Sequence, residues 1–104
     1  MNRVGLFVEL KARPGKGGEV AAFLAGAREA AAAEPETLVW FALRFDEERF
    51  GIFDSFADET GRAAHLNGPI AAALMDHAEA LLAEPPTIRQ VDVLADLIRA
   101  ATRD

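Results

Sequence analysis

The stretch TLVWFALRFDEERFGIFDSFA, residues 37–57, decides the fold. It predicts two β-strands, residues 37–46 and 49–57, joined at Glu47-Glu48 into an antiparallel hairpin. Both faces of the first strand are apolar, and the second carries phenylalanine on both faces. Helices of a small domain can cover only one face of such a sheet, so the second face needs another cover. We therefore expect a second copy of the chain to bury it.

The regions on either side of the hairpin complete an alternating order of strands and helices. Residues 3–12 and 87–94 alternate between apolar and other side chains, which predicts two more strands. Residues 17–33 have apolar residues at helical spacing and are followed by Pro35. Two further helices are expected at 58–66 and 69–83, with Asp58 as N-cap and a break at Asn67-Gly68-Pro69.

The resulting order, β-α-β-β-α-β, predicts an α+β domain of the ferredoxin-like type. Its four-stranded antiparallel sheet would carry the helices on one face. We expect one domain over residues 1–104, with a core at about 3–94. The tail, residues 95–104, is expected to form a helical turn or to fray. Pro14-Gly15 is typical of the centre of a type II turn.

Composition narrows the classes of function. Apolar residues make up 51% of the chain and charged residues 27%, which is typical of a globular protein rather than a disordered one. The net charge of −6 and the lack of a basic cluster argue against a nucleic-acid partner. No cysteine is present, which excludes disulfides and thiolate metal sites and fits a cytoplasmic location. No signal peptide and no membrane-spanning run is evident, so no membrane partner is expected.

Several segments together resemble the antibiotic biosynthesis monooxygenase family of dimeric α+β barrel proteins. They are RPGK after the first strand, Glu34-Pro35-Glu36 before the hairpin, the aromatic strands, and RAAHL at residues 62–66. The resemblance covers about residues 3–94. It implies two sheets packed face to face in a homodimer. It also implies, for some members, oxygenase chemistry without metal, flavin or any other cofactor, in which the deprotonated substrate itself reacts with dioxygen.

His65 is the candidate catalytic residue, because a histidine exchanges protons near neutral pH. The alternative is a structural histidine that hydrogen-bonds a nearby backbone group. The second histidine, His77, would be a pocket residue or simply a boundary residue of its helix. The candidate pocket is an apolar cavity between sheet and helices, in which each aromatic residue has core packing as its alternative. Its expected lining is Trp40, Phe7, Phe23, Phe53 and His77.

Two other observations bear on the chemistry. Asp54 lies inside an apolar strand, so it needs a partner, and Arg44 on the neighbouring strand is the plainest choice; a general base is the alternative. No spacing typical of metal ligands joins His65 to His77, so no metal is expected. Haem-degrading members of the family use an asparagine on the first strand and a tryptophan and a histidine on the helices. Here the first strand has no asparagine and the helical region has no tryptophan, which argues against haem degradation.

These observations lead to a first hypothesis: an oxidoreductase, a cofactor-independent monooxygenase acting on a small aromatic or quinone-type molecule. The second hypothesis is a ligand-binding or stress-related homodimer without enzymatic activity. The third is a structural dimer with a filled core. An enclosed, unfilled cavity of a few hundred Å³ touching His65 would favour the first two over the third.

Overall fold

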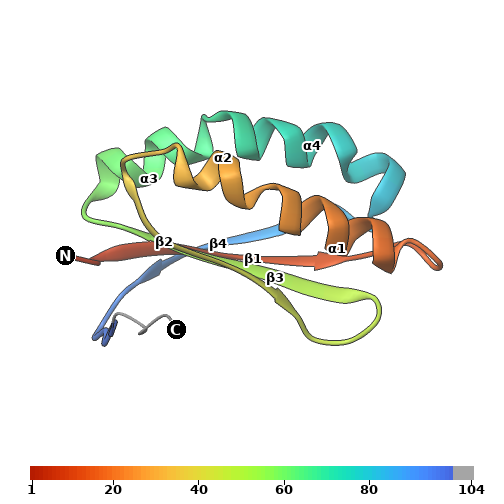
Figure 1. The fold of residues 1–104 in the computed structure, drawn as a ribbon, viewed down its shortest axis with the longest axis horizontal. Helices are drawn as coiled ribbons and strands as arrows, with labels where there is room; N and C mark the ends of the chain where they lie inside the picture. The colour runs from red at the N-terminus through yellow and green to blue at the C-terminus, as the bar shows by residue number, and fades with distance from the viewer. Residues whose placement is uncertain (100–104) are drawn as a thin grey trace, which may run out of the picture.

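The computed structural model describes residues 1–99. Its strands are β1 (Val4–Lys11), β2 (Thr37–Arg44), β3 (Arg49–Phe56) and β4 (Thr87–Asp92), and its helices are α1 (Gly17–Gly26), α2 (Arg28–Ala32), α3 (Glu59–Leu66) and α4 (Pro69–Leu81). The four strands form one antiparallel sheet in the order β2-β3-β1-β4. All the helices lie on one face of this sheet (Figure 1). The predicted ferredoxin-like α+β arrangement is confirmed.

The register of β1 and β3 divides the sheet into two distinct faces. Leu6 pairs with Asp54 on the face toward the helices, and Phe7 pairs with Phe53 on the opposite face. The core forms on the first of these faces, where the side chains of both strands meet those of α1 and α4. Its buried members include Leu6, Val8, Leu10, Val20, Leu24, Phe50, Ile52, Phe56, Ile70 and Leu74.

The opposite face of the sheet has no helix over it within residues 1–99 (Figure 1). Phe41 is 56% exposed and Leu43 37% exposed there, beside the half-buried Phe7 and Phe53. Phe45, which follows β2, is 54% exposed and its ring lies close to Gly51. Exposed aromatic and aliphatic side chains gathered on one sheet face in this way are rare on a monomer that has no partner.

One local expectation, the single helix at residues 17–33, is corrected by the structure. The helix expected at residues 17–33 is interrupted at Ala27, directly after Gly26, so α1 and α2 are separate. The N–H of Ala27 is shared between the carbonyls of Phe23 and Leu24, which tightens the turn where glycine weakens the helix. In the tail, residues 93–99 form no helix or strand, and residues 100–104 lie outside the described part of the chain.

The turns follow their local sequence. Gly15 has a φ of 81°, as the second central position of a type II turn requires, and the N–H of Lys16 donates to the carbonyl of Arg13. No helix within residues 1–99 is long and apolar enough to cross a membrane.

Candidate functional site

His65 lies in the last turn of α3, and its side chain points into the protein. The helix begins after Asp58, whose carboxylate accepts a hydrogen bond from the N–H of Gly61. It ends before Asn67, and Pro69 starts α4, as the Asn-Gly-Pro sequence predicts. The His65 side chain is only 8% exposed. It is therefore a buried histidine rather than a surface residue at a helix end.

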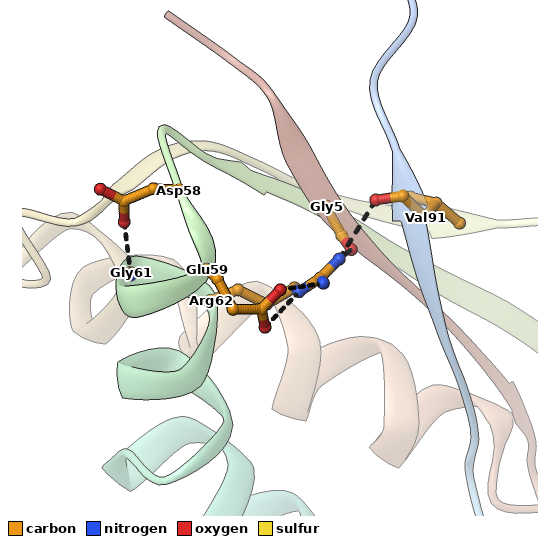
Figure 2. Close-up of polar contacts among 6 residues, drawn as sticks. All are labelled: Gly5, Asp58, Glu59, Gly61, Arg62 and Val91. Carbon is orange, nitrogen blue, oxygen red and sulfur yellow. Dashed lines mark hydrogen bonds and ion pairs between the residues drawn. The ribbon is translucent and has the colours of Figure 1, made fainter.

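Arg62, one turn before His65, holds α3 against the sheet. Its buried guanidinium donates from Nη1 to the carbonyls of Gly5 and Val91, at 3.2 Å each, and it forms an ion pair with Glu59 (Figure 2). Residues three apart lie on the same side of a helix. The contacts that fix Arg62 on β1 and β4 therefore also fix the direction in which His65 points.

Each ring nitrogen of His65 meets a different carboxylate. Nδ1 lies 2.6 Å from Oε1 of Glu34, in the connection between α2 and β2, and Nε2 lies 3.0 Å from Oδ2 of Asp54 on β3. Glu34 Oε1 also accepts a hydrogen bond from the hydroxyl of Thr37 at 2.8 Å. Phe56 packs against the imidazole, with ring centroids 5.4 Å apart. The site thus joins three elements that are distant in sequence.

The two carboxylates determine the charge of the imidazole. Burial alone lowers the pKa of His65, but the hydrogen bonds and negative charges of Asp54 and Glu34 outweigh it and raise that pKa to about 9. At neutral pH the ring is therefore an imidazolium that donates from both nitrogens. In this state His65 is a fixed positive charge between two carboxylates, not a free base.

Three buried polar atoms around this centre have no hydrogen-bond partner among the described residues. They are Oε2 of Glu34, Oδ1 of Asp54 and Nε1 of Trp40. Asp54 is 1% exposed, and Trp40 pairs with it across the β2-β3 ladder. Buried polar groups normally have partners, so these atoms mark places where a water or a ligand group would be held.

A hollow of about 430 Å³ opens beside Glu34 and His65. We call it the Glu34 hollow. Its wall is formed by the α2-β2 connection, α3 and the start of α4, and consists of Ala30, Ala33, Glu34, Pro35, Glu36, Thr37, Gly61, Ala64, His65, Gly68 and Pro69. The volume lies within the range of small-molecule sites. The hollow touches His65 but is open to solvent, so it is not the enclosed cavity that would favour the first two functional hypotheses over the third.

The other predicted pocket residues do not join His65 in this hollow. Phe7 and Phe53 lie on the far face of the sheet, so the expected place for them, between sheet and helices, is wrong. Phe23 and His77 contact each other at the α1-α4 contact, with ring centroids 4.9 Å apart. Trp40 packs against the core, close to Asp54 in the ladder. A substrate contact by any of these side chains stays a prediction.

His77 has the local contacts of a boundary residue. It is exposed, and its Nδ1 lies 2.8 Å from the carbonyl oxygen of Ala73 in the same helix. The two histidines of the chain thus differ in kind: His77 bonds to its own helix, and His65 bonds to side chains of two other elements.

The expected pairing of Asp54 with Arg44 is wrong, because Asp54 pairs with His65. Arg44 lies opposite Phe50 in the β2-β3 ladder, and its guanidinium is stacked 5.2 Å above that ring. Glu34 was missed altogether as a site residue. One signal was available: an acidic residue just after the C-terminus of a helix is unfavourable for the helix dipole, so its presence needs another reason.

Metal binding receives no support from this arrangement. Within the described range, residues 1–99, no group of three or more histidine, aspartate or glutamate side chains is placed to hold a metal ion. The nitrogens of His65 face one carboxylate each, on opposite sides of the ring.

No protein-family model matches the chain, and no curated protein does. Among solved structures, a protein of unknown function from Nitrosomonas europaea is 52% identical, with a TM-score of 0.93, over 97% of this chain and 98% of its own. The two chains belong to one family. This relationship assigns no activity to the chain.

More distant structures identify the fold. A second Nitrosomonas europaea protein, provisionally named an antibiotic biosynthesis monooxygenase, is 18% identical with a TM-score of 0.79 over 89% of this chain and 91% of its own. A protein from Chloroflexus aurantiacus with the same provisional name is also 18% identical, with a TM-score of 0.71 over 91% and 96%. The predicted resemblance to this group is confirmed at the level of the fold.

Proposed function

We propose that the protein is a cofactor-independent monooxygenase that binds a small aromatic or quinol-type molecule in the Glu34 hollow. The observation that carries this proposal is the meeting of an apolar hollow with a buried carboxylate–imidazolium–carboxylate centre. The shared fold with provisionally named monooxygenases supports it. The presence of both a mostly apolar hollow and ionisable groups is the usual signature of a small-molecule site.

In this proposal Glu34 receives the first proton. Its Oε1 is held by His65 and Thr37, while its Oε2 is buried and has no partner among the described residues. A turn of the side chain toward the hollow would bring this oxygen to a hydroxyl or acidic C–H of the substrate. His65 is then a positioning residue whose positive charge offsets the anion that forms. Asp54, bonded to the other nitrogen, fixes the ring orientation.

The overall reaction for a methylene substrate of the anthrone type is R₂CH₂ + O₂ → R₂C=O + H₂O. Transfer of a proton to Glu34 leaves the electron pair of the broken C–H bond on the substrate carbon. That carbon reduces dissolved dioxygen and, after the proton returns, carries a hydroperoxide. Breakage of the O–O bond with loss of the second hydrogen gives the carbonyl and water.

The second candidate is a small-ligand-binding protein without enzymatic activity. It is favoured by a specific observation: both nitrogens of His65 are occupied, and its pKa of about 9 keeps the ring protonated at neutral pH. An imidazolium of this kind stabilises a binding site without exchanging protons. In this second candidate function the protein binds the same class of ligand in the Glu34 hollow but does not convert it.

A homodimer is the assembly we propose for either function. Its support is the uncovered apolar face of the sheet, with Phe41 56% exposed and Leu43 37% exposed. A cytoplasmic location stays a prediction from the cysteine-free sequence.

Oxygen consumption with a panel of anthrones and hydroquinones tests the enzyme proposal. We expect turnover by the wild type and a loss of about 100-fold or more in Glu34→Gln and His65→Ala. His77→Ala, the matched control, should retain the wild-type rate. Absence of oxygen uptake with every compound would sink the monooxygenase reading for this substrate class and leave the binding function. Full activity in Glu34→Gln would remove Glu34 as the proton acceptor.

A further inference from the structure

A second apolar hollow adjoins the Glu34 hollow. The second one, of about 480 Å³, is lined by Ala22, Phe23, Gly26, Ala27, Ala30, Pro69, Ile70 and Ala73, and we call it the Phe23 hollow. Ala30 and Pro69 belong to the walls of both hollows. The two therefore adjoin between the α1-α2 and α3-α4 pairs of helices, which lie over the same face of the sheet (Figure 1).

The two hollows differ in chemistry. The Glu34 hollow contains the carboxylates of Glu34 and Glu36 and the imidazole of His65. No ionisable side chain belongs to the wall of the Phe23 hollow, which is made of alanine, glycine, proline, isoleucine and phenylalanine. A single ligand that fills both would have a hydrogen-bond-donating head at one end and an apolar body at the other.

The space next to Glu34 depends on Gly68. A Cβ placed on Gly68 would lie 3.3 Å from Oε2 of Glu34 and 3.2 Å from the carbonyl of Ala64. Oε2 has no partner among the described residues and is itself buried beneath the wall of the hollow. A ligand donor would reach it through a turn of the Glu34 side chain, which is 17% exposed.

We propose that the ligand is an amphiphile: a hydroxylated aromatic head that donates to Glu34 Oε2, joined to an alkyl or prenyl tail that lies in the Phe23 hollow. The hydroquinone form of the head rests on the proposed function. The position of the tail rests only on the apolar wall of the Phe23 hollow and on the two wall residues, Ala30 and Pro69, that this hollow shares with the head site. Each hollow has the volume of a small-molecule site, so the pair fits a longer ligand than a bare ring.

The test measures binding under anaerobic conditions, where no turnover takes place. Equilibrium dialysis compares 2-methyl-, 2-pentyl- and 2-decylhydroquinone at concentrations below micelle formation. We expect the Kd to fall at least about tenfold from the methyl to the decyl compound, because the added methylenes leave water. The dimethyl ether of decylhydroquinone has no donor and should bind at least about tenfold more weakly than its parent.

Two glycines provide a matched pair of variants for the tail. A Cβ on Gly26 or on Gly18 meets no heavy atom of the described residues within 4 Å, so both positions accept a larger side chain. Gly26 lines the Phe23 hollow and Gly18 does not. Gly26→Phe should abolish the dependence of Kd on tail length while leaving the methyl compound unaffected. Gly18→Phe should behave as the wild type.

The head is tested separately with Gly68→Ala and Glu34→Gln. Both should weaken binding of all three hydroquinones by a similar factor without changing the preference for the longer tail. Equal Kd values for the three tails, or an unchanged tail preference in Gly26→Phe, would overturn the amphiphile proposal. So would a failure of all three hydroquinones to bind.

The outcomes also separate this inference from the proposed function. Tail-dependent binding without oxygen uptake would leave the amphiphile site in place and remove the monooxygenase. Turnover of methylhydroquinone, together with Kd values that do not depend on tail length, would support the monooxygenase and remove the amphiphile site.

Discussion

The two faces of the sheet carry similar alternating apolar residues but reach opposite states. On the face toward the helices, even the charged Asp54 is 1% exposed, and it is paired with His65. On the other face, the wholly apolar Phe41 is 56% exposed. The difference in burial comes from the helices and not from the strands, because α1 to α4 all lie over one face of the sheet (Figure 1). Burial therefore follows from topology, and a buried charge requires a partner brought by another element.

The largest effect is expected from removing the imidazole on the covered face. His65→Ala leaves the carboxylates of Asp54 and Glu34 buried without a cation, and breaking a buried ion pair in this way costs about 3–5 kcal/mol. Urea unfolding at pH 7, followed by circular dichroism, measures the change. His77 is exposed, so the control substitution His77→Ala should change the free energy of unfolding by less than about 0.5 kcal/mol.

An equal loss of unfolding free energy in His65→Ala and His77→Ala would contradict the view that His65 neutralises the buried carboxylates. If His65→Ala does not fold, His65→Gln provides the same comparison, because an amide keeps a hydrogen-bond donor but not the charge.

The same centre predicts how stability changes with pH. Since folding raises the pKa of His65 from 6.5 to about 9, its stabilisation is fully present below pH 6.5 and is lost as the pH rises through about 9. The size of the effect is about 3 kcal/mol. Urea midpoints measured between pH 6 and pH 10 should therefore fall in the wild type.

His65→Gln is the control for this pH dependence, since it carries no titrating ring. Its midpoint should be nearly constant from pH 6.5 to pH 9. A parallel decline in both proteins would mean that another group is responsible.

Most of the fold could be predicted because alternation and helical spacing are local properties of the sequence. The partners of His65 could not, because Glu34 is 31 residues away in sequence and approaches only when α3 is docked. Asp54 did signal that a partner was needed. Arg44 was the wrong choice because it lies opposite Phe50, four residues from Asp54 on β3, which is roughly 13 Å along a strand.

The next prediction concerns dimer formation through the uncovered face of the sheet. If two such faces pack together, Phe41→Lys places a charge in the contact and should raise the dimer dissociation constant at least about tenfold. Size-exclusion chromatography with light scattering at micromolar concentration measures it. Ala32→Lys, exposed on α2, makes the same change of charge on the helical side and should leave the mass unchanged. A wild-type chain that is monomeric at this concentration would remove the dimer as the cover of this face.

The smallest effect is expected at Trp40, which lies on the covered face next to Asp54. Its Nε1 is buried without a partner in the described chain, so Trp40→Phe removes a donor that makes no bond and should cost less than about 1 kcal/mol beyond the loss of ring volume. A water bridging Nε1 to the unpartnered Oδ1 of Asp54 would change this result. In that case Trp40→Phe would cost about 1–3 kcal/mol, and Asp54→Asn would lower the cost of the tryptophan substitution. A double-mutant cycle with these two changes, measured by urea unfolding, decides whether Trp40 interacts energetically with Asp54 of the buried ion pair or is independent of it.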